Sequence, residues 1–331
     1  MTDRTDEQAM NGAAAARSPA LIALDWGTSS LRAYLLGADG VVLDRRGAAQ
    51  GIMQVADGDF AAAFEAVAGE WRRRWPDLES IACGMIGSAQ GWVEAPYLPC
   101  PAGPEELAGG LVPVPGGALR VVPGVAQYGE SPNVMRGEET QIAGALALNP
   151  ALRARSLLVM PGTHSKWVTI GQGRIARFDT YMTGELFAVL RGHSILGRFA
   201  RDTPKPAEDA AADAAFLRGV RAVREGGHLA PLLFSARALV LTGGLRPELS
   251  LDYLSGLLIG EELLCGLRGQ GLDRAEGVVL IGDPALCRRY REALALFGVS
   301  EVREIEDAAT AGLWRIATQA GLVAGTSRET A

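Results

Sequence analysis

The feature that most constrains the fold is a pattern that occurs twice. "ALIALDWGTSSLRAYLLGADGVVLD" occupies residues 20–44, and "SLLVMPGTHSKWVTIGQGRIARFD" occupies residues 156–179. Each copy reads as an apolar strand, a Gly-Thr pair with two more polar residues, a second strand, a glycine turn and a third strand. The second Gly-Thr pair follows the first by 135 residues. The pattern predicts a duplicated unit, whose two halves would face each other across a cleft.

The segments that follow each copy predict an alternation of helices and strands. Residues 59–75 have the apolar spacing of a helix, and "SIACGMIGS" reads as a strand that ends in a glycine loop. The proline-rich and glycine-rich residues 96–132 favour short strands and loops. The rest is predicted to contain a helix at 138–148, a strand leading into a glycine pair at 236–245, a long helix at 251–267, a strand and a helix within 277–298, a strand near Val302 and a helix at about 307–320.

Length, charge and cysteine usage narrow the class of protein. A chain of 331 residues with 48% hydrophobic content can bury a core large enough for two domains. Its net charge of -6 argues against nucleic acid or an anionic membrane as a partner. The four cysteines, which form no CxxC motif, indicate free thiols rather than a zinc site and favour a cytoplasmic protein. Residues 1–18 lack the apolar core of a signal peptide and are expected to be a disordered tail.

The loop of each repeated hairpin has the chemistry of a phosphate-binding site. Glycine permits close approach, while backbone N–H groups and hydroxyls bind phosphate oxygens. The candidates are Gly27, Thr28 and Ser29 in the first copy and Gly162 and Thr163 in the second. Asp25, at the end of the preceding strand, would hold Mg²⁺, which accepts sparse carboxylate ligation. The alternative is an ordinary turn, for which the same residue types are common. No Walker A motif occurs in the chain.

Several motifs together carry a resemblance to one family. "DWGTSSLRA", "GMIGSAQGW", "APYL", "NVMRGEETQ", "VMPGTHSKWV", "MTGEL" and "SGLLIGEE" occur in this order over residues 20–320. They resemble the 2-dehydro-3-deoxygalactonokinase family of the actin and hexokinase superfamily. The resemblance implies an α/β protein with two ribonuclease H-like domains around a central cleft. It also implies a kinase that uses ATP and Mg²⁺ to phosphorylate the terminal hydroxyl of 2-dehydro-3-deoxy-D-galactonate in galactonate catabolism.

The resemblance also implies a division of the chain. After the tail at 1–18, residues 19–150 would form the N-terminal domain with the first phosphate motif and the sugar site. Residues 151–306 would form the C-terminal domain with the second phosphate motif and an adenosine motif. The helix at 307–320 would return to the N-terminal domain. The adenosine motif around Gly282 is diverged, so only that glycine is assigned, and His164 joins the nucleotide-binding residues as a neutral hydrogen-bonding group.

Candidate catalytic acids lie in "MRGEETQ". A carboxylate is needed to take the proton of the acceptor hydroxyl, and relatives carry such an acid between the two phosphate motifs. Glu139 is the first candidate and Glu138 the second. The alternative role for both is stabilisation of a helix N-terminus. Glu185 in "MTGEL" is the reserve candidate, with the alternative of a solvated acid at a helix start.

A sugar acid carries a carboxylate, so its pocket needs a cation. Arg136 is the first candidate, because a guanidinium can bind a carboxylate through two hydrogen bonds. Lys166, one of two lysines in the chain, would serve that carboxylate or a phosphate, unless it is a surface residue. Ser88 and Trp92 would line the sugar site, although a core position explains Trp92 equally well.

Two other functions fit a fold of this type. An activator ATPase would need closely spaced cysteines for an iron-sulfur cluster, and the cysteines here are scattered. An assembly protein or sugar-responsive regulator would keep the ATP-binding fold, but the N-terminal tail is too short for a DNA-binding domain. A small-molecule kinase is therefore the preferred hypothesis. The sequence leaves open a homodimer and the choice between galactonate-type and gluconate-type acceptors.

Overall fold

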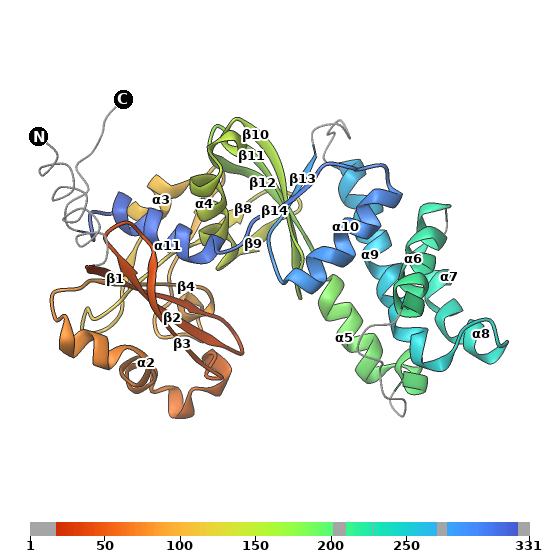
Figure 1. Ribbon diagram of the computed structural model, residues 1–331, viewed down its shortest axis with the longest axis horizontal. Coiled ribbons are helices and arrows are strands. Elements are labelled where there is room, and N and C mark those ends of the chain that lie inside the picture. The colour runs from red at the N-terminus through yellow and green to blue at the C-terminus, as the bar shows by residue number, and fades with distance from the viewer. Residues whose placement is uncertain (1–17, 201–209, 227, 270–276, 324–331) are drawn as a thin grey trace, which may run out of the picture. The chain divides into compact units, whose positions relative to one another are not determined.

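The computed structural model describes residues 18–200, 210–226, 228–269 and 277–323. They form two compact units (Figure 1). Of these described residues, the first unit holds those up to Arg155, the segment Ile170–Arg177 and those from Asp307 to Val323; the second holds Ser156–Thr169 and the described part of Phe178–Glu306. Apart from Ser18, the predicted disordered tail lies outside the described residues. In the part of the chain that is described, no helix is long and apolar enough to cross a membrane.

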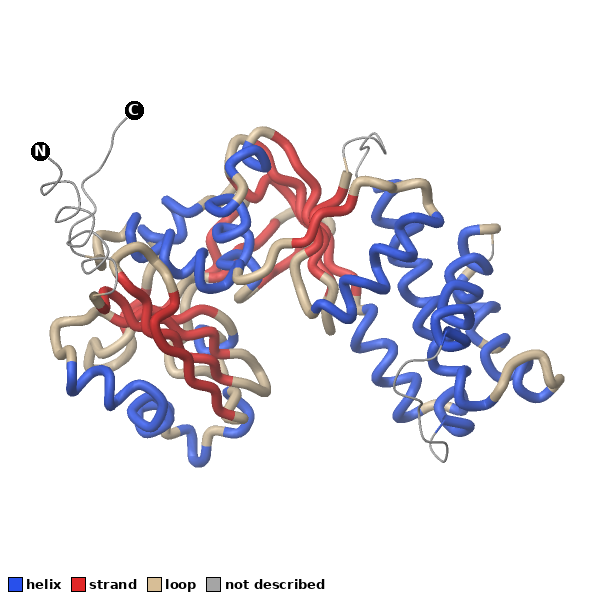
Figure 2. The backbone as a smooth tube through the Cα atoms, in the orientation of Figure 1, coloured by secondary structure: helices blue, strands red, loops and turns tan. Residues whose placement is uncertain are grey.

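A six-stranded sheet, in the order β3-β2-β1-β4-β7-β6, forms the centre of the first unit. Figure 2 draws the strands in red. β1 pairs antiparallel with β2 and parallel with β4. The predicted three-stranded meander and the strand after it are therefore confirmed. The strands are β1 (Pro19–Trp26), β2 (Leu31–Gly37), β3 (Val42–Ala48), β4 (Ser80–Cys83), β6 (Val112–Pro113) and β7 (Arg120–Val121); a separate small sheet holds β5 (Tyr97–Pro99), β8 (Gly124–Gln127) and β9 (Asn133–Met135).

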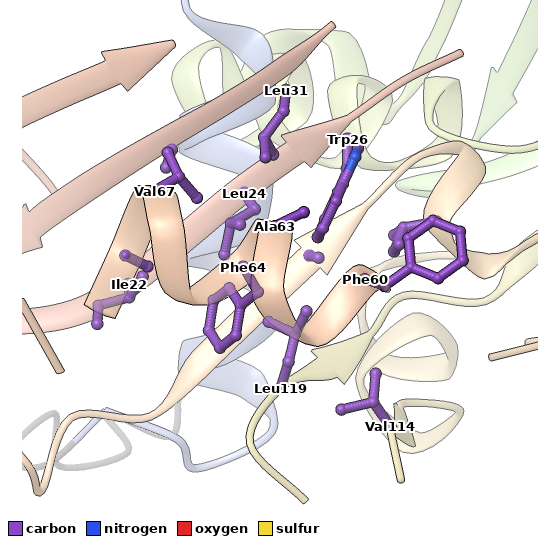
Figure 3. Close-up of a cluster of buried hydrophobic side chains, with 14 of the residues drawn as sticks. Ile22, Leu24, Trp26, Leu31, Phe60, Ala63, Phe64, Val67, Val114 and Leu119 are labelled. Carbon is purple, nitrogen blue, oxygen red and sulfur yellow. The ribbon is translucent and has the colours of Figure 1, made fainter. Parts of the chain in front are cut away.

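The helix α2 (Phe60–Arg74) packs on one face of the six-stranded sheet. Alternate residues of a strand point to the same face, so Ile22, Leu24 and Trp26 of β1 all contribute to one core. Figure 3 shows them clustered with Phe60 and Phe64 of α2, and all five side chains are at most 8% exposed. The apolar residues whose spacing predicts this helix are thus the ones that it buries against the sheet.

Two further helices, α4 (Glu138–Leu148) and α11 (Ala308–Gln319), pack against each other in the first unit, and α11 also contacts β1 and β4. Glycines allow the close crossing. A β-carbon on Gly144 would lie 1.9 Å from a carbonyl oxygen of α11, and one on Gly312 would lie 1.8 Å from a carbonyl oxygen of α4. The backbones therefore touch where most helix pairs are held apart by side chains.

The second unit is built on a five-stranded sheet in the order β12-β11-β10-β13-β14. β10 pairs parallel with β13, and β13 pairs parallel with β14. This order repeats β3-β2-β1-β4-β7 of the first sheet, so the predicted duplication is confirmed. The strands are β10 (Arg155–Met160), β11 (Ser165–Gly171), β12 (Arg174–Tyr181), β13 (Val278–Leu280) and β14 (Val302–Glu304).

The helices of the second unit repeat the glycine crossing of the first. A β-carbon on Gly256 of α9 would lie 2.0 Å from a carbonyl oxygen of α6, and one on Gly219 of α6 would lie 2.3 Å from a carbonyl oxygen of α9. Figure 1 shows α6, α7, α8 and α9 grouped together. The helices are α5 (Thr183–His193), α6 (Ala210–Arg224), α7 (Leu229–Leu233), α8 (Ser235–Leu241), α9 (Ser250–Gly269) and α10 (Pro284–Leu296).

Two sequence predictions need correction. The segment 236–245, predicted as a strand, contains most of the helix α8. A short apolar run fits either structure, and its burial decides: Ala236 is buried while Leu241 is 61% exposed, so the run lies on the surface of the unit rather than inside a sheet. The segment 96–132 has the predicted short strands but also a short helix, α3 (Pro104–Gly109), which begins at a proline.

The close crossing of α4 and α11 predicts that Gly144→Val destabilises the first unit. The added side chain must push two backbones apart, which costs about 3 kcal/mol or more of the free energy of unfolding. Gly109→Ala is the control, because a β-carbon there meets no atom within 4 Å, and its effect should stay below about 1 kcal/mol. Urea denaturation measures both variants, and equal midpoints for the two would contradict the packing argument.

Candidate active site

The first cluster of candidate residues lies where β1 and β4 end. Asp25 of β1 stands opposite Cys83 of β4 in the parallel register, and it pairs with Arg32, with 3.6 Å between Nη1 and Oδ2. Burial raises the pKa of Asp25, and the positive charge of Arg32 lowers it by less. Asp25 is thus a poorly solvated carboxylate with one distant cation. Such a group gains from a second positive charge nearby.

The loop after β1 exposes its hydroxyl side chains. The N–H of Gly27 donates to the carbonyl of Ser30 at 2.9 Å, and the N–H of Ile52 donates to the carbonyl of Gly27 at 3.0 Å. Thr28 and Ser29 are exposed at the tip. The backbone is therefore held from behind, and the predicted phosphate-binding side chains face solvent.

Arg136, just before α4, has an unusual environment. Its residue is 9% exposed, its Nη2 donates to the carbonyl of Ala95 at 2.7 Å, and its guanidinium carbon lies 4.3 Å from the ring centre of Tyr97. Its Nε and Nη1 are buried and have no hydrogen-bond partner among the described residues, and the same holds for the hydroxyl oxygen of Ser88. A β-carbon on Gly87 would lie 2.9 Å from Nη1 of Arg136. The structure thus places Arg136 against the loop that carries Ser88. Both of these predicted sugar-site residues have polar atoms without a partner among the described residues.

Trp92, the third predicted sugar-site residue of this unit, packs against the core. Its ring centre lies 5.9 Å from that of Phe64, and it contacts the cluster beneath the six-stranded sheet. The sequence allowed either a sugar-site role or a core position for Trp92, and this contact fits the core position.

The two acids at the start of α4 have different surroundings. Glu138 is partly exposed, and its Oε2 accepts a hydrogen bond from the N–H of Arg136 at 3.0 Å. Glu139 is 0% exposed and accepts from the N–H of Gly137 at 2.6 Å and from the hydroxyl of Thr140 at 2.9 Å. Burial, with a smaller contribution from the charge of Glu138, raises the pKa of Glu139 to about 8. Only Glu138 is within reach of solvent in this conformation.

The second cluster surrounds the loop between β10 and β11. Thr163 and His164 are exposed at its tip, and the carbonyl of Thr163 accepts from the N–H of Glu185 at 3.0 Å. Nε2 of His164 also contacts a carboxylate oxygen of Glu185. Lys166 is 4% exposed, so it is not the surface lysine that the sequence allowed. The structure therefore brings the PGTH and MTGEL motifs together at the start of α5.

A cavity of about 660 Å³ opens beside this loop. Its size is typical of small-molecule sites. Gly282 does not line it, but lies next to Pro161, whose carbonyl oxygen would be 3.2 Å from a β-carbon on Gly282. The walls hold residues that the sequence did not single out, because nothing in a helical pattern distinguishes a cavity wall from a core. They include Phe187 and Arg191 of α5, Leu251, Asp252 and Ser255 of α9, and Leu286, Arg289 and Tyr290 of α10, besides Gly162 and Thr163.

Within the described residues, no group of three or more His, Cys, Asp or Glu side chains is placed to hold a metal ion. Asp25 is the predicted Mg²⁺ ligand, and a single carboxylate would suffice only where phosphates complete the coordination. Its raised pKa and distant cation are compatible with that role.

Comparison with known proteins decides the family. The model of the 2-keto-3-deoxy-galactonokinase family matches residues 25–316, which include every candidate residue above. The chain belongs to this family. The resemblance carried by the motifs is thereby confirmed, and membership of a kinase family favours phosphoryl transfer over the activator ATPase and regulator hypotheses.

Individual relatives agree with the family match. A Rhizobium meliloti protein described as a probable 2-dehydro-3-deoxygalactonokinase is 42% identical, over 88% of this chain and 94% of its own. The 2-dehydro-3-deoxygalactonokinase of Escherichia coli is 36% identical, over 84% and 90%. A crystal structure of a Sinorhizobium meliloti protein with the same enzyme name superposes with a TM-score of 0.79 at 38% identity, over 90% of this chain and 98% of that one. The two-domain α/β fold expected from the sequence is confirmed.

The raised pKa of Glu139 predicts a pH-dependent stability. The folded state binds this proton more tightly than the unfolded state, so the stabilisation is complete below pH about 4.5 and is lost as the pH rises through about 8. The loss is on the order of 3 to 5 kcal/mol. Glu139→Gln, which stays neutral, should remove it in urea denaturation between pH 5 and 9. An unchanged pH dependence in Glu139→Gln would contradict the assigned pKa.

Proposed function

We propose that this protein uses ATP to phosphorylate the terminal hydroxyl of 2-dehydro-3-deoxy-D-galactonate, which yields 2-dehydro-3-deoxy-6-phosphogalactonate. The names of its relatives support the reaction. The single observation in this chain that carries the proposal is the state of Arg136, a buried cation with unused hydrogen-bond donors. It fits an acceptor that carries a carboxylate.

Arg136 supports an acidic substrate for an energetic reason. A guanidinium keeps its charge at all physiological pH values, so burial cannot be relieved by loss of a proton. The carbonyl of Ala95 and the ring of Tyr97 offset part of the cost, but two of its three nitrogens have no acceptor. A buried charge without a partner is unfavourable, and a carboxylate would supply both charge and acceptors. The unpartnered hydroxyl of Ser88 offers the same ligand a further donor.

A phosphate-binding role is assigned to the hairpin loop of each unit, taken by itself. Thr28 and Ser29 offer N–H and hydroxyl groups in the first unit, where Gly27 permits close approach, and the exposed Thr163 and His164 lie beside the cavity of the second. Asp25 would hold Mg²⁺, which, when bound, neutralises charge on the phosphates. The proposal thus assigns the two loops to phosphates and the 660 Å³ cavity to the nucleoside.

The acceptor hydroxyl must lose its proton to a carboxylate during transfer. The sequence ranks Glu139 before Glu138, but burial supports the reverse order. A base must come within hydrogen-bond distance of the hydroxyl, and Glu138 is partly exposed whereas Glu139 is fully buried. We therefore assign the base to Glu138, with Glu139 buried behind it. Glu185 becomes the base only if neither acid is needed.

The carboxylate-binding role of Arg136 predicts a selective kinetic effect. Arg136→Lys keeps a positive charge but loses the planar donor set, so KM for the sugar acid should rise by about 10-fold or more while KM for ATP changes less than about twofold. Arg120→Lys is the control, because Arg120 faces solvent with Glu79 as its partner. Steady-state kinetics with each substrate varied in turn measures both. An unchanged KM for the acid, or an equal rise in both KM values, would contradict the assignment.

The base assignment predicts that Glu138→Gln lowers kcat by a factor on the order of 100, with little change in either KM. Glu139→Gln should be milder. If instead only Glu139→Gln abolishes turnover, the base is Glu139 and this conformation must open to expose it. Full activity in both variants would exclude the start of α4 and direct attention to Glu185.

A further inference from the structure

A buried carboxylate in the second unit has no role in the reaction as described so far. Glu262 of α9 is 2% exposed. Its Oε1 accepts a hydrogen bond from the indole N–H of Trp167 at 2.8 Å, and its Oε2 accepts from the hydroxyl of Tyr290 at 2.7 Å and from the hydroxyl of Thr183. The donors come from β11, α10 and the first residue of α5. One side chain therefore joins four elements.

The donor set calls for a carboxylate at this position. An indole N–H can only donate, so the atom facing Trp167 must be an acceptor. The atom facing Tyr290 and Thr183 must also accept, unless both hydroxyls turn away. Burial raises the pKa of Glu262, and its hydrogen bonds lower the pKa in part. Apolar packing would fill the same space at a lower desolvation cost. The carboxylate is thus better explained by the three donors that it positions than by a contribution to the stability of the fold.

The groups that Glu262 holds are parts of the cavity wall. Thr183 and Tyr290 line the cavity, whereas Glu262 does not. Next to Thr183, a β-carbon on Gly184 would lie 2.5 Å from the carbonyl oxygen of Gly162, so the start of α5 is packed directly on the PGTH loop. The position of Thr183 therefore determines the position of that loop.

A second connection runs through Tyr290. Its hydroxyl lies 3.2 Å from Oγ of Ser165, and that oxygen accepts from the N–H of Gly162 at 3.3 Å. A continuous chain of hydrogen bonds thus leads from Glu262 to the backbone of the loop. Both connections end at Gly162.

We infer that Glu262 is a positioning residue for nucleotide binding. Its carboxylate fixes Tyr290, the start of α5 and the Gly162–Thr163 loop in one arrangement around the cavity. The inference rests on the proposed function in one respect, namely that this cavity takes the nucleotide. Glu262 itself touches no substrate. Its removal should weaken nucleotide binding and leave the binding of the sugar acid alone.

The test compares Glu262→Gln with Glu261→Gln. The amide keeps the shape of the side chain but sets a donor against either Trp167 or the two hydroxyls. Glu261 precedes it on α9 and accepts a hydrogen bond from the thiol of Cys265, so it serves as the matched control. Titration calorimetry with Mg²⁺ and ADP, without any sugar acid, should give a Kd at least 10-fold higher for Glu262→Gln and within twofold of wild type for the control.

Kinetics separate positioning from a merely structural role. We expect KM for ATP to rise about as much as the Kd for ADP, while KM for the sugar acid stays within twofold. A protein that is only less stable would show a lower apparent kcat with both KM values unchanged, and that result would overturn the inference. Unchanged ADP binding in Glu262→Gln would overturn it as well.

A second variant keeps the inference testable if Glu262→Gln does not fold. Ser165→Ala removes the link between Tyr290 and Gly162 but keeps the carboxylate of Glu262, and it should also weaken ADP binding, by about threefold or more. Wild-type binding in Ser165→Ala would then count against the inference. A wild-type protein that binds ADP but does not phosphorylate the sugar acid would overturn the proposed function and leave this inference standing.

Discussion

The parallel pairing of β1 with β4 is the constraint on which the first half of the site depends. Because parallel strands end at the same edge of a sheet, Asp25 and Cys83 lie side by side. The loops that follow these strands, Gly27–Ser30 after β1 and Met85–Ser88 after β4, must begin at that edge. β10 and β13 repeat the pairing in the second unit, where the Gly162–Thr163 loop follows β10. One topological unit, used twice, therefore supplies both predicted phosphate loops.

In each unit, a pair of helices that cross closely at glycines packs within the same fold as these loops. Gly144 and Gly312 bring α4 and α11 into backbone contact, and Gly219 and Gly256 do the same for α6 and α9. The close contact fixes where α4 starts, and the start of α4 carries Glu138 and Glu139. The candidate acids of the first unit therefore lie next to this packing contact, because the carbonyl of Thr140 is the atom that meets Gly312.

Three buried charged or chargeable groups show different solutions to desolvation. Glu139 has a pKa raised to about 8, so a proton relieves its burial over most of the neutral range. Glu262 is satisfied by an indole and two hydroxyls. Arg136 can do neither, because it cannot lose its charge and two of its nitrogens lack acceptors. This difference is why Arg136, and not the other two, is assigned to a ligand.

The sequence predicts most of the architecture because hydrophobic period and turn chemistry are local. The meander at 20–44 and the helix at 138–148 follow from such signals. The prediction of a strand at 236–245 was wrong. A short apolar run fits a strand or a surface helix, and only burial in the folded protein distinguishes the two.

Site residues were harder to predict for a related reason. Motifs single out Asp25, Arg136 and the two Gly-Thr loops as candidates. The choice between Glu138 and Glu139 as the proposed base depends on burial, which the sequence of two adjacent glutamates does not reveal. Tyr290 and Glu262 are far from Thr183 in the sequence and meet only through packing.

The central claim is that a buried, unsatisfied guanidinium selects an acidic acceptor. The most direct test measures ADP release by the wild-type protein with 2-dehydro-3-deoxy-D-galactonate and with neutral hexoses such as galactose. We expect a kcat/KM at least about 100-fold higher for the acid, since a site built for a charged group rejects ligands that leave it unpaired. Equal or faster turnover of a neutral sugar would contradict the claim.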